Sequence, residues 1–193
     1  MNLTEMVLKT RSYRRFDQGK AIKAETLVEL VDTARQAGSA ANRQPLKYIV
    51  CAEPATNAKL FAHLRWAGYL QGWGGPVEGE RPTGYIIVLT DTEINKEAAT
   101  DVGIAAQTIM LGATEVGLGG CMLGAIDRDE IRKLFSVPER HAISLVLALG
   151  VPVEQVVLEP VGPDGDIKYY RDGKQVHHVP KRTLDEVLLS KIG

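Results

Sequence analysis

Three arginines and a serine lie close together near the N-terminus, where residues 11–16 read Arg-Ser-Tyr-Arg-Arg-Phe. A guanidinium can donate paired hydrogen bonds to phosphate oxygens, and the hydroxyl of Ser12 adds a short donor. Positive charges this close repel one another unless an anion or solvent neutralises them. A solvated basic surface is the more common explanation of such a cluster, so this segment predicts an anion site only together with other groups.

A second polar segment, Gly38–Pro45, joins a predicted helix to a predicted strand. Its small residues expose backbone amides, and Asn42 and Gln44 each offer a donor and an acceptor. Pro45 biases Gln44 towards an extended conformation. Such a loop can bind the edge of a planar heterocycle that alternates donors and acceptors. The alternative is a helix cap followed by a polar turn, which the segment by itself favours.

The glycine-rich segment Gly117–Ala125 could cradle a phosphate. Its spacing, however, differs from Gly-x-Gly-x-x-Gly at the start of a helix, and no Gly-Lys-Ser/Thr follows, so dinucleotide-binding and P-loop sites are excluded. Gly124 and Ala125 instead fall at a predicted strand-to-helix turn. Free amides there point outwards, and a flat ring can lie close to the main chain.

A late basic pair, Lys181 and Arg182, could complete a phosphate site with Arg11, or could be an ordinary surface pair. The preceding His177 and His178 do not predict a metal site. Adjacent histidines on a strand face opposite ways, and no nearby set of cysteine or acidic residues completes a coordination sphere.

No Ser-His-Asp spacing, Gly-x-Ser-x-Gly elbow or paired-carboxylate pattern occurs, so we expect no catalytic side-chain base. The formal net charge of -1 argues against nucleic acid as a partner. No apolar run reaches the roughly 20 residues that span a bilayer. The N-terminus lacks a secretory signal, and Cys51 and Cys121 are too far apart for a Cys-x-x-Cys motif. These features predict a cytoplasmic protein whose cysteines are core residues.

Periodicity and capping residues predict the elements that carry these segments. Thr4, Thr92 and Asp127 are expected helix caps, and Gly38 a left-handed helix end. Helices are expected over Thr4–Lys9, Ala24–Ala37, Pro54–His63, Glu93–Val116, Arg128–Phe135 and Thr183–Lys191. Strands are expected over Leu46–Cys51, Tyr85–Leu89 and Ile143–Leu149, with a short one inside Gly117–Ala125. Gly68–Pro82 is expected to be a long loop and Val151–Gly165 irregular. This mixture predicts one α+β domain over residues 1–193.

In this order, Arg-Ser-x-Arg-x-Phe, Ser-Ala-x-Asn-x-Gln-Pro, a Gly-Leu-Gly strand ending in Gly-Ala-Ile-Asp, and a C-terminal basic pair resemble the nitroreductase family of FMN-dependent oxidoreductases. The resemblance extends over nearly the whole chain. It implies a central, mostly antiparallel sheet flanked by helices, and a domain-interlocked homodimer with FMN at the interface. It also implies NADH or NADPH as reductant, and ping-pong transfer to a nitroaromatic, quinone or similar small acceptor.

The resemblance assigns roles to residues in three groups. The phosphate and ribityl chain would be held by Arg11, Ser12 and Lys181, with Arg182 sharing the last role, and Arg14 would lie near the pyrimidine edge. Ser39, Asn42 and Gln44 would bind the cofactor from the loop. Gly124 and Ala125 would offer backbone contact near the reactive N5. Thr10, Gly38, Leu46 and Lys181 depart from residues common in the family.

The aromatic residues Trp66, Tyr69 and Trp73 could line a cleft by stacking, although aromatic residues in long loops are more often packing anchors. Two other functions fit the same residues. The chain could be a non-catalytic module that binds a flavin or another phosphorylated ligand, or a structural dimer without a cofactor.

Overall fold

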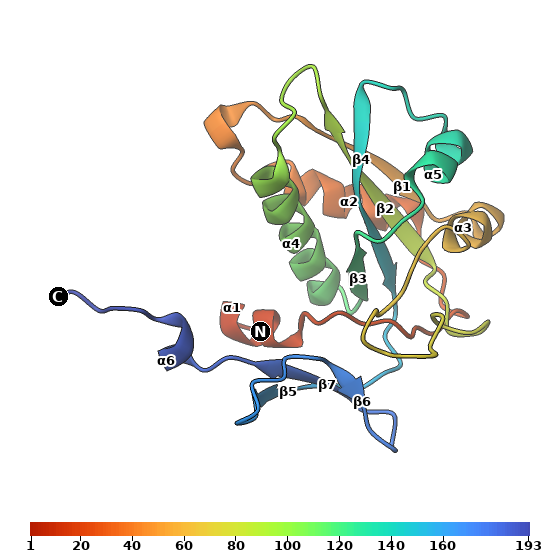
Figure 1. The fold of residues 1–193 in the computed structure, drawn as a ribbon. Helices are drawn as coiled ribbons and strands as arrows, with labels where there is room; N and C mark the ends of the chain where they lie inside the picture. Colours follow the sequence, from red (N-terminus) through yellow and green to blue (C-terminus); the bar gives the residue numbers. More distant parts are fainter. The chain divides into compact units, whose positions relative to one another are not determined.

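Backbone contacts divide the computed structural model, which describes residues 1–193, into two units (Figure 1). The first unit comprises Met1–Trp66 and Gly75–Val153, and the second comprises Ala67–Gly74 and Glu154–Gly193. No helix in either unit has both the length and the apolar character that crossing a membrane requires.

The first unit is built on a four-stranded sheet in the order β1-β2-β4-β3, in which all neighbours are antiparallel. The strands are β1 (Leu46–Cys51), β2 (Gly84–Asp91), β3 (Gly119–Leu123) and β4 (His141–Gly150). Every residue of β2 is buried, as its continuous apolar run predicts for a central strand. The predicted mostly antiparallel sheet is therefore confirmed.

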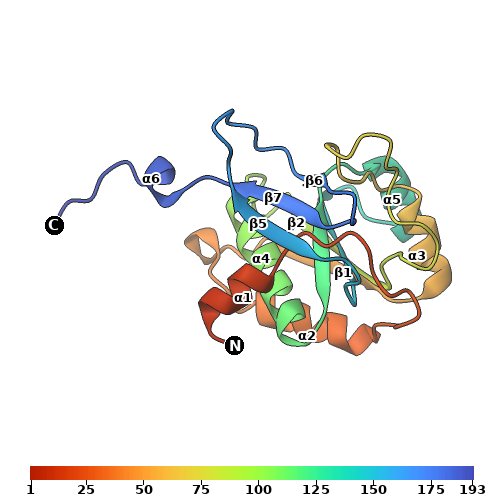
Figure 2. The same ribbon diagram turned by 90° about the horizontal axis from the view of Figure 1, so that it is seen from below.

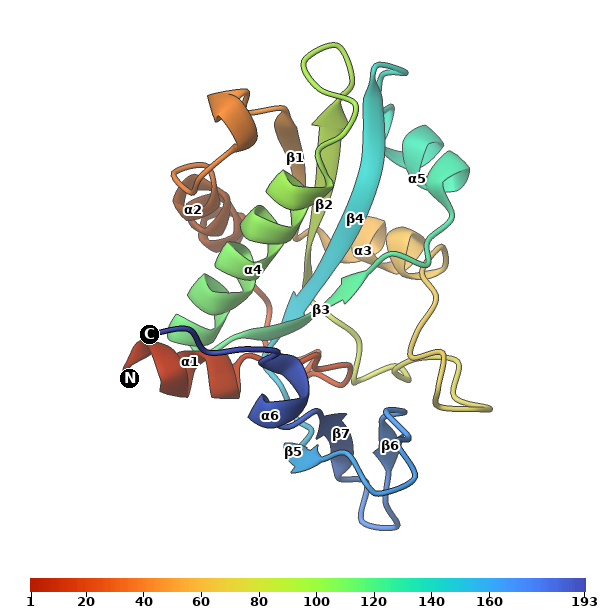
Figure 3. The ribbon, with the colours of Figure 1, turned by 60° about the vertical axis from the view of Figure 1, so that its left-hand side comes forward.

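Helices cover both faces of this sheet. They are α1 (Leu3–Lys9), α2 (Ala24–Ala34), α3 (Pro54–Phe61), α4 (Ala99–Glu115) and α5 (Arg128–Phe135). Figure 3 shows α2 and α4 on one side of the sheet and α3 and α5 on the other. Leu27, Ile86, Ile109 and Leu147 meet in the core between α2, α4 and the sheet. The N-terminal α1 packs on α4 (Figure 2). The hydroxyls of Thr10 and Thr114 lie 2.8 Å apart.

Two predicted helix starts are wrong. Asn2, not Thr4, caps α1, because its Oδ1 accepts from the Glu5 N–H at 2.9 Å while the Glu5 carboxylate accepts from the Asn2 N–H at 3.0 Å. Thr92 caps no helix, since α4 begins only at Ala99. The backbone after β2 instead folds back on Asp91, whose side chain accepts from the Glu93 N–H and pairs with Arg140 at 2.9 Å.

Three predicted helix ends are also too late, and one of them lies in the second unit, where the helix predicted over Thr183–Lys191 ends at Val187. The helix α2 stops at Ala34, before Gly38, which therefore is not its left-handed cap. The helix α3 stops at Phe61, although its predicted start at Pro54 is confirmed, with Glu53 as its cap. The predicted strand Leu46–Cys51 and the helix Arg128–Phe135 capped by Asp127 have the predicted bounds.

The second unit contains a three-stranded sheet in the order β5-β7-β6. Its strands are β5 (Val156–Pro160), β6 (Tyr170–Arg171) and β7 (His177–Lys181), followed by the short helix α6 (Leu184–Val187). The prediction that 151–165 is irregular is wrong at Val156–Pro160, because β5 pairs in parallel with β7. Each β5 residue pairs with a residue twenty-one positions further along the chain, which no local pattern indicates.

Side chains from residues 67–74 pack onto this second sheet. The ring of Tyr69 lies 5.0 Å from that of Tyr169, and the guanidinium of Arg171 lies 4.3 Å from the ring centre of Trp73. Arg171 also pairs with the buried carboxylate of Glu154 at 2.9 Å. These contacts favour the alternative that Tyr69 and Trp73 are packing anchors. The third aromatic residue, Trp66, is buried in the first unit.

The two cysteines form no disulfide and are buried, as predicted for core residues. Burial raises the pKa of the Cys51 thiol, which disfavours the thiolate that a nucleophile requires.

Candidate functional site

The arginine-rich segment runs along β3, an edge strand of the first sheet. The Tyr13 N–H donates to the Gly120 carbonyl at 2.9 Å, and Ser12 forms a parallel bridge with Gly120. A Cβ atom added at Gly119 would lie 2.6 Å from the ring of Tyr13, so only glycine allows this approach. Gly119, the second glycine of the Gly-Leu-Gly motif, therefore lets the N-terminal segment pack against the sheet.

The three arginines of this segment have different environments. Arg15 is neutralised by Glu80, with Nε 2.8 Å from one carboxylate oxygen. Arg14 is buried, and its Nη1 donates to the Ser12 carbonyl at 3.2 Å. Arg11 makes no ion pair; one terminal nitrogen donates to the Val7 carbonyl, and its buried Nε has no partner.

The electrostatics of Arg11 suit an anion. Desolvation lowers the pKa of Arg11, because burial disfavours a charge that no carboxylate compensates. The neighbouring Ser12 is exposed and makes no side-chain hydrogen bond within the protein. A buried orphan donor beside a free hydroxyl fits an anionic group with several acceptor oxygens.

The polar loop between α2 and β1 has an unusual backbone. Ala41, Asn42 and Gln44 have φ angles of 49°, 52° and 51°, in the left-handed region. Asparagine tolerates this region better than alanine or glutamine. Each such non-glycine residue costs about 1–3 kcal/mol unless its surroundings hold it there, and strain of this kind is concentrated at functional sites.

Hydrogen bonds within the loop, and one from α4, hold its backbone in place. The hydroxyl of Ser39 accepts from the Gln44 N–H at 2.9 Å, and the Gln44 side chain donates to the Asn42 side chain at 3.0 Å. From α4, the buried carboxylate of Asp101 accepts from the Ala40 N–H at 2.8 Å. The side chains of Asn42 and Gln44 stay exposed, so the loop presents amide groups to the solvent.

A cavity of about 180 Å³ lies beside this loop. It is bounded by the end of α2, the start of β1 and α4, and includes Ser39, Gln44, Tyr48 and Asp101. Burial, with the negative charge of Asp101 second, raises the pKa of Tyr48 and keeps its phenol neutral. The Asp101 Oδ2 atom is buried without a partner in this wall.

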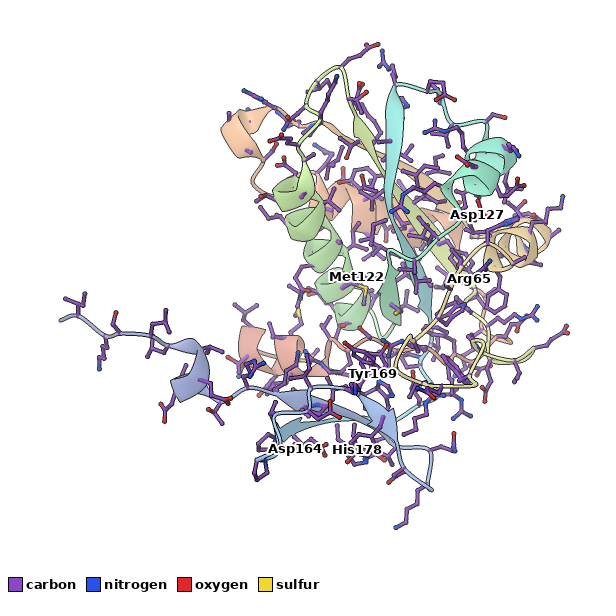
Figure 4. The ribbon with its side chains drawn as sticks, in the orientation of Figure 1. Arg65, Met122, Asp127, Asp164, Tyr169 and His178 are labelled. Carbon is purple, nitrogen blue, oxygen red and sulfur yellow. The ribbon has the colours of Figure 1, made fainter.

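The turn after β3 leaves its main chain open. A Cβ atom at Gly124 would meet nothing within 4 Å, and both Gly124 and Ala125 are exposed. The Ala125 carbonyl accepts from the Arg65 N–H at 3.0 Å, and the Gly124 carbonyl from the Arg128 side chain at 3.3 Å. Figure 4 shows Met122 on β3, with Arg65 and Asp127 on the segments that flank the turn.

Lys181 and Arg182 belong to the second unit. Lys181 ends β7, and Arg182 lies 3.5 Å from Glu186 in an exposed ion pair. Their joint phosphate site with Arg11 stays a prediction.

One chain brings some of these groups together and separates others. Arg11, Ser12 and Arg14 lie at β3, with Gly124 and Ala125 at the far end of that strand. The polar loop precedes β1, at the opposite edge of the sheet. The polar loop and the Arg11 segment are separated by three strand spacings, about 14 Å across the sheet. They are also offset by about 23 Å along the strands, the length of the seven residues from Ala142 to Leu149.

Sequence reasoning missed the groups that organise the site. Glu80, which neutralises Arg15, lies 65 residues away from it in the chain. Arg65 and Arg128, which hold the turn after β3, carry no motif. Asp101 had a usable signal, since an acidic residue among small helical residues needs a partner if it is buried, and that partner is the Ala40 N–H.

The sequence of this chain is similar to those of known proteins. The sequence model described as "Nitroreductase family" matches residues 7–69 and 77–151 of the chain. A Methanothermobacter thermautotrophicus protein named NADH dehydrogenase/NAD(P)H nitroreductase is 30% identical over 161 residues, covering 80% of this chain and 79% of that protein. An NADPH-flavin oxidoreductase of Vibrio harveyi is 26% identical over 180 residues, covering 82% of this chain and 69% of that protein.

A solved structure agrees at the level of the fold. The crystal structure of a nitroreductase family protein from Clostridium difficile 630 aligns with a TM-score of 0.65 at 25% identity. The alignment covers 80% of this chain and 86% of that one.

Proposed function

We propose that this chain, which belongs to the nitroreductase family, is an FMN-dependent oxidoreductase that uses NADH or NADPH. The names of the two relatives, one with NAD(P)H and one with NADPH and flavin, support this activity. The structural observation that carries the proposal is the uncompensated guanidinium of Arg11, with its orphan Nε, beside the free hydroxyl of Ser12.

The donor set of this chain fits FMN. Arg11 and Ser12 would hold the phosphate and ribityl chain, with Lys181 and Arg182 completing that site. Arg14, buried and always charged, would place a positive charge near the pyrimidine edge. A fixed positive charge there would stabilise negative charge that develops on reduction.

The remaining contacts would come from two loops. The amides of Asn42 and Gln44, in a loop organised by Ser39, match the alternating donors and acceptors of a flavin edge. The open main chain at Gly124 and Ala125 would let a flat ring approach closely.

When bound, FMN would supply the redox chemistry, which is hydride transfer from NAD(P)H and then electron transfer to a nitroaromatic, quinone or similar small acceptor in a second half-reaction. The protein would bind and orient the cofactor and the substrates and would exclude water from them. No side-chain base is required for this role, in keeping with the lack of a catalytic triad in the sequence.

We further propose that the full chain is a single nitroreductase-like domain and that two copies form the site in an interlocked homodimer. The separation of the polar loop from the Arg11 segment within one chain supports this. A second copy could bring its own polar loop to the Arg11 segment of the first. The C-terminal Leu189 and Ile192 support it too, since each is 96% exposed and gains by burial against a partner.

An anaerobic titration tests the activity. The purified protein should carry flavin absorbance, and NADH or NADPH should bleach it. If dithionite bleaches the flavin while neither nucleotide does, the chain is a flavin-binding module and the oxidoreductase proposal fails.

A double variant tests the phosphate assignment. Arg11→Ala/Ser12→Ala should lose at least about tenfold in FMN affinity, because two donors to the phosphate disappear, one of them charged. Quenching of FMN fluorescence measures the affinity. Lys20→Ala is the control, since its exposed pair with Asp17 lies outside the proposed site. Full FMN retention in the double variant would remove Arg11 and Ser12 from the site.

A further inference from the structure

A second cavity, of about 120 Å³, lies where β1 ends, α3 begins and the chain enters β2. Apolar side chains, among them Pro54, Phe61 and Pro82, form much of its wall. None of the residues proposed to bind FMN lines it, and no acidic residue does so. The cavity is therefore separate from the proposed cofactor site and needs its own explanation.

Arg81 brings an uncompensated positive charge to this cavity. Its guanidinium carbon lies 4.5 Å from the ring centre of Phe61. Its side chain makes no ion pair and no hydrogen bond, and the buried Nε has no partner. The adjacent Glu80 is held by Arg15 and so does not neutralise Arg81.

Other polar groups in the wall are mostly occupied in holding the fold. The hydroxyl of Thr83 donates to the Lys20 carbonyl at 2.9 Å, and Gln18 Oε1 accepts from the Arg81 N–H at 3.2 Å. Burial raises the pKa of the Tyr85 phenol, and the positive charge of Arg81 opposes this rise. The charge of Arg81 therefore acts on Tyr85, but the neutral phenol does not compensate it.

Asn57 supplies a second unsatisfied group. This residue is only 7% exposed and lines the cavity. Its Nδ2 donates to the Thr83 carbonyl at 3.0 Å, which fixes the orientation of the amide. Its Oδ1 is buried without a hydrogen-bond partner. Native proteins rarely leave a buried donor such as the Arg81 Nε unpaired in the wall of a cavity, and this donor is the group that an anion would satisfy, because the Asn57 Oδ1 can only accept.

We propose that this cavity is a binding site for a small monocarboxylate, held by the guanidinium of Arg81. A carboxylate matches the planar donors of a guanidinium, and one charge balances one charge. The apolar walls suit a short hydrocarbon group and disfavour a strongly hydrated phosphate dianion. At about 120 Å³ the cavity is smaller than the cavities of about 150 Å³ that hold benzene, which limits the ligand to a few carbon atoms.

Butyrate is the probe, with butyramide as its neutral counterpart. The protein as purified is titrated with each compound while two-dimensional NMR follows the side-chain amide of Asn57, which is buried in the wall of this cavity. Butyrate should shift the Asn57 signal saturably and butyramide should not. Arg81→Gln should weaken butyrate binding by at least about tenfold, the loss expected for a charge-assisted hydrogen bond.

Two further variants test whether binding requires Arg81 and this cavity. Arg35→Gln removes an arginine that is exposed and paired with Asp32 on α2, and should leave butyrate binding unchanged. Ala58→Leu should block binding by filling the cavity while Arg81 stays in place. Three results would overturn the proposal: an Asn57 signal that butyrate does not shift, equal binding of butyrate and butyramide, or displacement of butyrate by an equal concentration of phosphate.

Discussion

At the scale of single residues, Asp101 has the most consequential position that no motif marks. It is 3% exposed, and its one hydrogen bond reaches the Ala40 N–H, 61 residues away in the chain. That bond ties the core helix α4 to the strained loop that carries Asn42 and Gln44. We interpret Asp101 as a positioning residue, since it contacts the loop and not the proposed cofactor.

Replacing this carboxylate should loosen the loop. Asp101→Ala leaves the Ala40 N–H without its acceptor, and losing a hydrogen bond to a charged group costs about 1.5–3 kcal/mol. We expect weaker FMN binding and faster hydrogen exchange at Ala40 in the protein without cofactor. Asp101→Asn keeps an acceptor oxygen and should restore much of both properties. Unchanged exchange at Ala40 in Asp101→Ala would contradict this role.

At the scale of elements, the glycines of β3 let the arginine-rich segment and β4 approach. A Cβ atom at Gly120 would lie 2.5 Å from Leu149 Cδ2 and 2.7 Å from the Ala148 carbonyl oxygen. The carbonyl belongs to the backbone of the neighbouring strand β4 and cannot turn away.

Gly120→Ala should therefore destabilise the protein by about 1–3 kcal/mol, the usual cost of overpacking. Urea unfolding of the protein without cofactor measures this free energy. Gly124→Ala is the matched control, because its Cβ would meet open space and should change stability by less than about 0.5 kcal/mol. Equal stability of the two variants would show that β3 adjusts more freely than its contacts imply.

The second sheet carries a pH-sensitive contact at His178 on β7. Its Nδ1 lies 2.9 Å from Glu159 of β5, its Nε2 lies 3.5 Å from Asp172, and its ring stacks on Tyr170 of β6. The hydrogen bond with Glu159, and then that with Asp172, raises the pKa of His178 although desolvation opposes them. The charged imidazole therefore links all three strands.

This raised pKa determines the sign of the pH dependence. The stabilisation is fully present below the unfolded pKa of about 6.5 and is lost as the pH rises through the folded value. The melting temperature of the wild type should fall more between about pH 6 and 8 than that of His178→Gln. An NMR titration that gives His178 a pKa of 6.5 or below would contradict the prediction.

At the scale of the whole molecule, the apolar C-terminal tail predicts association. Leu184 and Val187 on α6 are exposed, as are Leu189 and Ile192 beyond it. A tail with this composition gains about 25 cal/mol for each Å² of apolar surface that it buries. We therefore expect sedimentation to give twice the chain mass of 21.0 kDa.

Charges in the tail should weaken this dimer. Leu189→Asp/Ile192→Asp should shift the equilibrium towards single chains, because the interface would then have to desolvate two carboxylates. Val77→Asp provides a control at another exposed apolar residue, 64% exposed in the loop before β2. A wild-type protein that sediments as a single chain at every concentration would exclude the dimeric site.

The sequence by itself determined the type of most elements, and it predicted residues for the candidate site whose roles stay predictions. Periodicity and β-branched runs are local, so Leu46–Cys51 and Arg128–Phe135 could be predicted to the residue. Helix starts were less predictable, because Asn2 caps α1 in place of Thr4, and because the chain at Thr92 turns onto Asp91 and does not begin a helix. The motif residues Arg11, Ser12 and Asn42 could be named without knowledge of how far apart they lie.

Only the tertiary structure decided which groups meet. It placed β1 and β3 at opposite edges of one sheet, paired Arg15 with Glu80, joined Asp101 to Ala40, and left Arg81 uncompensated beside a cavity. The physical reason is the same in each case. These contacts join residues far apart in the chain, and their formation depends on the packing of the whole core, which no local pattern of side chains specifies.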